Sequence, residues 1–321
     1  MMRRSFFCVL MLALMLSATL SGCGDSPDAA SGNTISADKI LKLIRQGKTV
    51  QISNKRVKGK LDFTNLAASD KKLNFSNVYI PVEISFRNCV FEDSVVAFRD
   101  DRAARIQVST AFERNVSFLE CDFQQALCMS QTDFRGRMDF DISKVQGEAD
   151  FSGAHFRSGT SFCMANFNSD TYFVSCNFEG RCNFMKVFFR DAAVFQYVRF
   201  QDAVMFADAH FYGGVDFSKV FALNVVDFAN SKFAGNVTLA YSQFLGDLRM
   251  IAVKYSGNLN MLGNTFLGQL NMEKAQFGSS LLLADNSFFN APSIGGAALP
   301  DSCRVEQKNN KFADFDVKQL F

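Results

Sequence analysis

The side chains in this sequence that are best suited to metal binding or proton transfer are those of its two histidines. His155 and His210 are separated by five periods of the eleven-residue repeat described below. Two periods make one coil, so the separation is two and a half coils and places the two rings on opposite sides of the molecule. A shared metal ion or a histidine dyad needs both rings at one point. We therefore expect two surface histidines and predict no catalytic residue, no metal site and no cofactor.

Cysteine thiols are the second reactive group, and their spacings contain neither CxxC nor a disulfide framework. Four of them fall at small, inward-facing positions of the repeat, where cysteine acts as a compact apolar residue. No two of these four are separated by one regular coil, so we expect none to stack on another. We predict free structural thiols, although one sequence-close pair, the third and fourth inward cysteines, could instead be oxidised. The inward four are Cys89, Cys121, Cys176 and Cys182, and the off-position cysteines are Cys128, Cys163 and Cys303.

Three polar residues, each one coil from the next, share another inward position. Ser242, Asn264 and Asn286 should form a vertical ladder inside the last coils. Asparagine side chains one strand spacing apart can bond to each other and so tolerate burial. A structural ladder is therefore the favoured interpretation, and a binding pocket is the alternative.

Two charged segments could also suggest chemistry. Asp100 and Asp101 are adjacent carboxylates, but arginines flank them within 99–105, which indicates a salt-bridged bulge. The densest basic cluster is Asn54–Lys60. It could contact lipid headgroups, although a solvated edge strand whose lysines block pairing is the favoured interpretation. The sequence contains no Walker loop, GxSxG, HExxH or dinucleotide-binding fingerprint.

Phenylalanine at a fixed spacing organises the chain that must position these residues. Two interleaved series each have a period of eleven, so that the steps alternate between five and six residues. A fixed short period indicates a stacked repeat. The residue two before each Phe is small or β-branched, so each short extended segment sends one small and one large side chain inward. The series run through Phe151, Phe162, Phe173, Phe184, Phe195, Phe206, Phe217 and Phe228, and through Phe156, Phe167, Phe178, Phe189, Phe200 and Phe211.

This pattern resembles the pentapeptide-repeat family in its Phe-centred variant. Ala149–Gly153, Ala154–Phe156 and Gly59–Phe63 carry the resemblance, which covers residues from about 60 to about 290. It implies an all-β fold, a right-handed quadrilateral β-solenoid in which four steps of the repeat make the four sides of one coil. From Leu73 to Phe288 we expect about nine or ten coils. Ser36–Gly47 is predicted to form a short N-terminal helix that caps the first coil.

The N-terminus has the layout of a secretory signal. Positive charge at residues 1–4 is followed by the apolar run 6–16, which is too short to span a membrane as a stable helix. Leu20–Cys23 resembles a bacterial lipobox, which implies cleavage before Cys23 and lipidation of its sulfur. A plain signal peptide with an incidental cysteine is the alternative. Because Gly24 follows the cysteine, we expect an outer-membrane lipoprotein that faces the periplasm.

These observations predict five parts of the chain. They are a lipoprotein signal peptide (1–22), a flexible tether (23–34), an N-terminal helix and strand cap (35–60), the solenoid (61–290, with a charged insertion near 98–111) and a C-terminal cap (291–321).

The charge balance narrows the function. The chain has 34 basic and 32 acidic residues. Loss of Arg3 and Arg4 with the signal would leave basic and acidic residues equal in number. A neutral mature chain disfavours a broad basic face for nucleic acid. We expect a lipid-anchored, non-enzymatic structural or protein-interaction module of the cell envelope, whose partner is another envelope protein or polymer, with no small-molecule substrate. The alternative is a topoisomerase-binding DNA mimic, a known role in the family, which the export signal and neutral charge disfavour.

Overall fold

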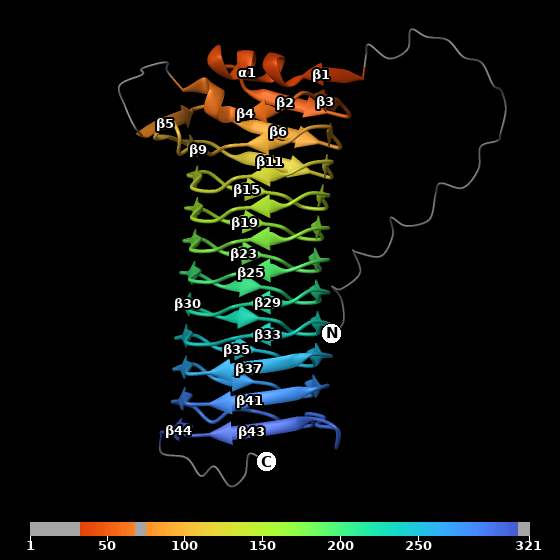
Figure 1. The fold of residues 1–321 in the computed structure, drawn as a ribbon, viewed down its shortest axis with the longest axis vertical. Helices are drawn as coiled ribbons and strands as arrows, with labels where there is room; N and C mark the ends of the chain where they lie inside the picture. The colour runs from red at the N-terminus through yellow and green to blue at the C-terminus, as the bar shows by residue number, and fades with distance from the viewer. Residues whose placement is uncertain (1–32, 68–74, 314–321) are drawn as a thin grey trace, which may run out of the picture. The chain divides into compact units, whose positions relative to one another are not determined.

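The computed structural model describes residues 33–67 and 75–313, which form one compact unit. This unit is a column of stacked coils, a parallel β-solenoid of about 12 turns with one short α-helix at its N-terminal end (Figure 1). The predicted signal peptide, Cys23 and nearly all of the predicted tether lie outside the described residues. So does the end of the chain beyond Ala313.

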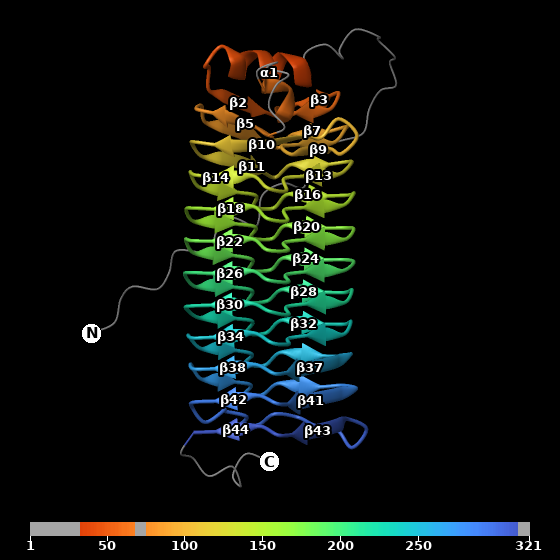
Figure 2. The same ribbon diagram turned by 60° about the vertical axis from the view of Figure 1, so that its left-hand side comes forward.

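Four parallel sheets make the four sides of the column, and the chain visits sheets B, A, C and D in turn (Figure 2). Most strands contain two residues because each side of a coil is short. Sheet A contains β1 (Thr34–Ser36), β3 (Arg56–Lys58), β7 (Val90–Phe91), β12 (Asp122–Phe123), β16 (Lys144–Val145), β20 (Asn166–Phe167), β24 (Phe188–Phe189), β28 (His210–Phe211), β32 (Lys232–Phe233), β36 (Lys254–Tyr255) and β40 (Gln276–Phe277). Sheet B contains β2 (Val50–Ser53), β6 (Ile84–Arg87), β11 (Val116–Leu119), β15 (Met138–Asp139), β19 (Thr160–Ser161), β23 (Cys182–Asn183), β27 (Val204–Met205), β31 (Val226–Asp227), β35 (Leu248–Arg249) and β39 (Leu270–Asn271).

The other two sheets complete each coil and include the longest strands. Sheet C contains β4 (Leu61–Asp62), β8 (Val95–Val96), β13 (Leu127–Cys128), β17 (Ala149–Asp150), β21 (Thr171–Tyr172), β25 (Ala193–Val194), β29 (Val215–Asp216), β33 (Val237–Thr238), β37 (Asn258–Leu262), β41 (Ser280–Ala284) and β43 (Arg304–Lys308). Sheet D contains β5 (Phe75–Ile80), β10 (Ile106–Phe112), β14 (Asp133–Phe134), β18 (His155–Phe156), β22 (Asn177–Phe178), β26 (Arg199–Phe200), β30 (Phe221–Ala222), β34 (Gln243–Phe244), β38 (Thr265–Phe266), β42 (Ser287–Phe288) and β44 (Lys311–Phe312). The strand β9 (Arg99–Asp101) pairs with β10.

The core confirms that the regularly spaced phenylalanines point inward. One Phe series points inward from sheets B and C, and the other from sheets A and D. Rings of successive coils stack face to face: the Phe184 centroid lies 4.9 Å from that of Phe162 and 4.7 Å from that of Phe206. Rings of different sheets meet edge to face, as Phe184 and Phe195 do at 5.7 Å. The column therefore has a continuous aromatic centre, and such pairs add about 0.5–1.5 kcal/mol each beyond area burial.

The N-terminal helix α1 (Ala37–Arg45) covers the first coil, as the sequence predicts. The Ser36 hydroxyl accepts a hydrogen bond from the Lys39 amide at 3.3 Å, and Gly47 follows the helix with a φ of 66°. Ile40, Leu41 and Ile44 are buried against the core. The lid closes the apolar end of the column, which would otherwise be open to water.

The first coil begins earlier than the sequence suggests. Strands β2 and β3 already belong to sheets B and A, so 50–58 is part of the solenoid and not of a separate cap. After β3 the chain turns at Gly59, whose φ is 82°, and Phe63 opens the 3₁₀ helix η1 (Phe63–Leu66).

The predicted C-terminal cap is a further coil. Bridges Asn271↔Ser293 and Gln276↔Ala298 extend sheets B and A, and strands β43 and β44 extend sheets C and D. The Pro292 and Gly295–Gly296 positions therefore do not stop the coil. Together with the early start of the first coil, this addition explains why the column has more turns than the nine or ten expected. 

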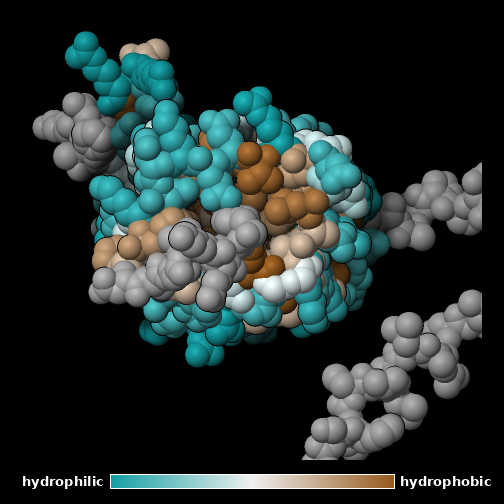
Figure 3. Space-filling model, turned by 90° about the horizontal axis from the view of Figure 1, so that it is seen from below, coloured by the Kyte–Doolittle hydropathy of each residue, from teal (hydrophilic) through white to brown (hydrophobic). Residues whose placement is uncertain are grey.

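Figure 3 views the column from this end and shows apolar side chains gathered near its middle within a hydrophilic rim. A small apolar hollow lies among the inward side chains of the last two coils. It is lined by Leu270, Met272, Leu283, Phe288, Pro292, Ile294 and Phe312, together with the polar Gln307 and Asn310.

The charged insertion is a β-hairpin. Strand β9 runs antiparallel to β10, with Asp101 opposite Ile106. The Asp101 carboxylate accepts a hydrogen bond from the Ala104 amide at 2.9 Å within the turn, and Asp100 forms an exposed ion pair with Arg102 at 3.5 Å. The predicted salt bridge is present, and backbone pairing makes the predicted bulge an ordered hairpin.

Candidate functional site

The candidate site lies beside the hairpin, where the strands β5 and β10 of sheet D extend beyond the corner of the column. Strand β10 pairs with β5 over six residues, from Gln107↔Phe75 to Phe112↔Ile80, where most strands of this sheet contain two. The corners of the following coils carry no such extension. A cavity of about 620 Å³ therefore lies between the hairpin and the adjoining corner.

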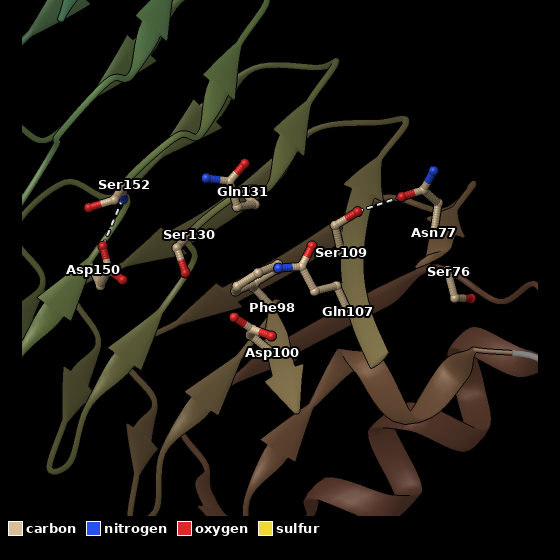
Figure 4. Close-up of a pocket in the computed structure, with 10 residues that line it drawn as sticks. All are labelled: Ser76, Asn77, Phe98, Asp100, Gln107, Ser109, Ser130, Gln131, Asp150 and Ser152. Carbon is tan, nitrogen blue, oxygen red and sulfur yellow. Dashed lines mark hydrogen bonds between the residues drawn. The ribbon is translucent and has the colours of Figure 1, made fainter. Parts of the chain in front are cut away.

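Polar side chains and one aromatic ring line this cavity (Figure 4). The half-buried Phe98 lies in the middle of the group, with Asp100 and Gln107 beside it and Ser130 facing it. The wall comes from strands β5, β9 and β10, and the floor from residues at and near the corner of the next two coils. The lining residues are Ser76, Asn77, Phe98, Asp100, Gln107, Ser109, Ser130, Gln131, Asp150 and Ser152.

Hydrogen bonds fix part of the lining and leave two of its side-chain amides available. The Ser109 hydroxyl donates to the Asn77 amide oxygen at 2.5 Å, and one Asp150 carboxylate oxygen accepts from the Ser152 amide at 2.8 Å. Among the described residues, no hydrogen bond engages the side-chain amide of Gln107 or Gln131. The site thus holds pre-positioned acceptors together with amides that can both donate and accept.

The histidines lie on opposite sides of the column, as predicted. His155 is on sheet D, where its Nε2 lies 2.6 Å from a Glu179 carboxylate oxygen and 2.8 Å from the Asn177 amide nitrogen. His210 is on sheet A, with its ring 5.0 Å from that of Phe188. Partial burial, followed by the charge of Lys232, lowers the pKa of His210. Neither histidine lines the cavity.

The four inward cysteines are buried, and all seven cysteines that the structure describes are free thiols. One prediction about them is wrong: Cys89 and Cys121 do stack on each other, because Val90 pairs with Asp122 in sheet A. The hairpin lengthens the coil between them, so counting in steps of one regular coil missed this pair. Burial raises the pKa of the Cys176 and Cys182 thiols, in keeping with a structural role.

The polar ladder is present. Among Ser242, Asn264 and Asn286 the side-chain amides bond to backbone groups, and an amide-to-amide hydrogen bond runs from the Asn286 Nδ2 to the Asn310 Oδ1 of the next coil at 3.1 Å. The Asn264 Nδ2 donates to the Leu239 carbonyl at 2.6 Å, and the Ser242 amide donates to the Asn264 Oδ1 at 2.9 Å. Asn286 repeats the pattern with the Met261 carbonyl and the Asn264 amide. The ladder is fully buried and lines no cavity among the described residues. The structural interpretation therefore describes it better than a pocket does.

The basic segment 54–60 is not an edge strand. Strand β3 lies between β1 and β7, so its backbone is paired on both sides. Arg56 pairs with Glu92 at 2.5 Å and Lys60 with Asp62 at 3.2 Å. Neighbouring carboxylates thus offset part of the positive charge of the cluster.

Sheet A presents a basic and aromatic surface that the sequence analysis missed. Phe188, His210, Lys232 and Lys254 are consecutive outward residues of this sheet. The Arg190 guanidinium lies 4.6 Å from the Tyr212 ring centroid and 5.4 Å from that of Phe188. A count from His210 in steps of one coil would have identified the row.

The described residues were also compared with the requirements of a metal site and of a membrane-spanning helix. Within 33–67 and 75–313, no three His, Cys, Asp or Glu side chains are placed so that they could hold one metal ion. No helix in this part of the chain is long and apolar enough to cross a membrane.

The four-sided coil, with a small and a large side chain inward on each side, defines a repeat protein of the β-solenoid class. Residues 173–220 match the family model for pentapeptide repeats (9 copies), and these residues lie in the regular middle of the column. The chain is a pentapeptide-repeat protein. No curated protein matches it.

Proposed function

We propose that this protein is a lipid-anchored module of the cell envelope that holds another envelope protein against its side without catalysing a reaction. A ladder of exposed apolar side chains on sheet D carries this proposal. Each member follows the last residue of its strand, one per coil over four coils. The members are Leu223 (43% exposed), Leu245 (36%), Leu267 (45%) and Phe289 (55%).

This apolar ladder is suited to binding a protein. At a strand spacing of about 4.8 Å, four coils give a strip roughly 14 Å long. Exposed apolar patches on soluble proteins mark sites of contact with a partner. The backbone beneath the strip is fixed by a continuous hydrogen-bond ladder, with Leu245 donating to Ala222 and Leu267 to Phe244 at 2.8 Å each. A partner would therefore meet a rigid surface and lose little free energy in ordering it.

Anchoring in the envelope rests on the lipobox-like Leu20–Cys23 and the apolar segment before it. A DNA mimic would instead need a continuous acidic face in the cytoplasm. Sheet A carries the opposite charge in the stacked Lys232 and Lys254. The envelope role is therefore the better supported of the two functions.

Fractionation tests the anchor. We expect wild-type protein to incorporate labelled palmitate and to sediment with membranes, and Cys23→Ala to lose both properties. A Cys23→Ala protein that remains in the membrane fraction to the same extent would show that lipidation of Cys23 is not the anchor.

Photo-crosslinking in intact cells tests the contact surface. A photoreactive amino acid at Leu245 should give one discrete crosslinked product. The matched control is Ser256, which is exposed and follows its strand on the opposite sheet in the same way. Equal products from both positions, or none from Leu245, would contradict the assignment of this surface.

A further inference from the structure

We propose that the cavity beneath the β9–β10 hairpin binds a neutral oligosaccharide. The hairpin is not needed for stacking, since the chain turns the corresponding corner of later coils in a few residues. Gln131 and Gly153, for example, each make that corner within a tight turn of positive φ. Fixing the additional residues of the hairpin costs conformational entropy. Because the hairpin encloses a polar cavity, binding of a ligand in that cavity explains why the chain contains a segment that is costly to order.

The lining matches the surface chemistry of a sugar. Sugar hydroxyls both donate and accept hydrogen bonds. They therefore pair well with carboxylates, which only accept, and with side-chain amides, which donate and accept. Asp150 supplies acceptor oxygens, whereas Gln107 and Gln131 supply amides with both capacities. The half-exposed Phe98 ring offers an apolar face against which the C–H groups of a sugar ring can pack. One aromatic ring among convergent polar groups gives both affinity and orientation.

The charge of the described lining disfavours anionic ligands. Among the residues that the structure describes, the charged lining residues are Asp100 and Asp150, and no described Lys, Arg or His lines the cavity. Arg102 pairs with Asp100, but its side chain is 92% exposed and points to solvent. A sulfated or carboxylated sugar would meet like charge and lose hydration without gaining a partner. A neutral sugar meets only hydrogen-bonding groups.

The size of the cavity sets the length of the ligand. Ligand sites in proteins range from about 300 to 1,000 Å³, and this one is about 620 Å³. That volume accommodates a disaccharide or a short segment of a longer chain. The cavity opens on the side of the column, so a polysaccharide could enter it without a free end.

Binding of the purified full-length protein to an array of neutral, sulfated and sialylated oligosaccharides tests this inference. We expect at least one neutral oligosaccharide to bind and the anionic ones to bind less. The strongest neutral binder then serves as the titrant for calorimetry. An array on which no neutral oligosaccharide binds, or on which anionic sugars bind best, would overturn the proposal.

Variants assign any binding to the cavity. Gln107→Ala should weaken binding about tenfold, the effect of losing one well-formed hydrogen bond. Phe98→Leu keeps an apolar side chain but removes the ring face, and should weaken binding at least as much. Gln243→Ala is the matched control, because Gln243 is an outward glutamine of the same sheet remote from the cavity. If Gln107→Ala and Phe98→Leu both bind like the parent and the control, the sugar binds elsewhere and the proposal fails. The assay uses purified protein, so its outcome is independent of the anchor and of the apolar ladder.

Discussion

Cys89 and Cys121 occupy the same inward position of successive coils, although the whole inserted hairpin lies between them in the chain. Their strands are paired in register through Val90↔Asp122 and Phe91↔Phe123. Cys89 also donates to the Arg87 carbonyl at 3.4 Å, and Cys121 to the Leu119 carbonyl at 3.3 Å. The side-chain contact between the two thiols lowers the pKa of Cys89 and raises the pKa of Cys121. The two thiols thus form one coupled pair across the inserted hairpin.

This arrangement predicts that mild oxidation joins the two cysteines. Neighbouring strands are about 4.8 Å apart, within the roughly 4.4–6.8 Å that separates the Cα atoms of disulfides. Diamide should take up two protons and two electrons from the thiols and leave the pair bridged. Closing a loop of this length should stabilise the protein by about 3–4 kcal/mol in the chain-entropy model. Peptide mapping and guanidinium unfolding would measure the two effects.

Cys121→Ala is the control for the bridge. It should abolish both the Cys89-containing crosslinked peptide and the shift of the unfolding midpoint. Cys176 and Cys182 should stay alkylatable after unfolding of the oxidised protein. A bridge that instead joins Cys176 to Cys182 would contradict the predicted pairing.

The aromatic centre predicts a large loss of stability at Phe184. Its ring is fully buried between those of Phe162 and Phe206. Phe184→Ala should cost about 3–5 kcal/mol, and Phe184→Asp should prevent folding because it buries an unpaired charge. Circular dichroism during thermal unfolding measures both. Met205→Asn, at a 41% exposed position one coil away, should change stability by less than about 0.5 kcal/mol. A Phe184→Asp protein with the parent's midpoint would disprove the stacked core.

The column could be predicted from the sequence because the residues that repeat are those whose side chains point into the core. It did not predict the cavity, since the conformation of 98–111 depends on pairing between β9 and β10, which has no period. Cys89 and Cys121 were missed for the same reason: the hairpin shifts the count between them. The last coil was missed because β43 contributes no inward aromatic residue, and its backbone pairing with β41 is what continues the sheet. The partners of Asn264 were missed because they are backbone carbonyl and amide groups, which a sequence pattern does not distinguish.

The adjacent glycines Gly213 and Gly214 predict that the same substitution by alanine has different effects on stability. A Cβ on Gly213 would approach the Asp191 carbonyl oxygen of the preceding coil to 2.5 Å, whereas one on Gly214 would have the Asn236 oxygen as its nearest neighbour at 3.9 Å. Neither has a positive φ, so close approach of the coils is the relevant constraint and not backbone conformation. Gly213→Ala should lower stability by about 1–3 kcal/mol, as overpacking does. Gly214→Ala should be neutral or slightly stabilising. Equal unfolding midpoints for the two variants would contradict this account.

The polar ladder predicts that an apolar residue of similar size is worse than asparagine inside the last coils. Asn264→Leu would leave the Leu239 carbonyl and the Ser242 amide without partners in the core. Each unsatisfied group costs about 1–3 kcal/mol, so urea unfolding should show a loss of at least about 2 kcal/mol. Asn260→Leu, on the outward side of the same coil, provides the comparison and should cost less. If Asn264→Leu proved as stable as the parent, the amide hydrogen bonds would have no net structural value.

Buried thiols predict a decline of stability at alkaline pH. Burial raises the pKa of Cys176 and of Cys182, so the folded protein keeps both protons where the unfolded chain loses them. Above the ordinary thiol pKa of about 8.5 unfolding therefore releases protons, and the free energy of unfolding falls as the pH rises. Each thiol should contribute a slope of up to about 1.4 kcal/mol per pH unit. The Cys176→Val, Cys182→Val double variant should show a shallower decline between pH 9 and 11 by guanidinium unfolding. Val198→Ala, which enlarges the space beneath Cys176 without removing a thiol, should lower stability and keep the parent's slope. Parallel pH profiles for the parent and the double variant would show that these thiols ionise as readily in the folded column as in the unfolded chain.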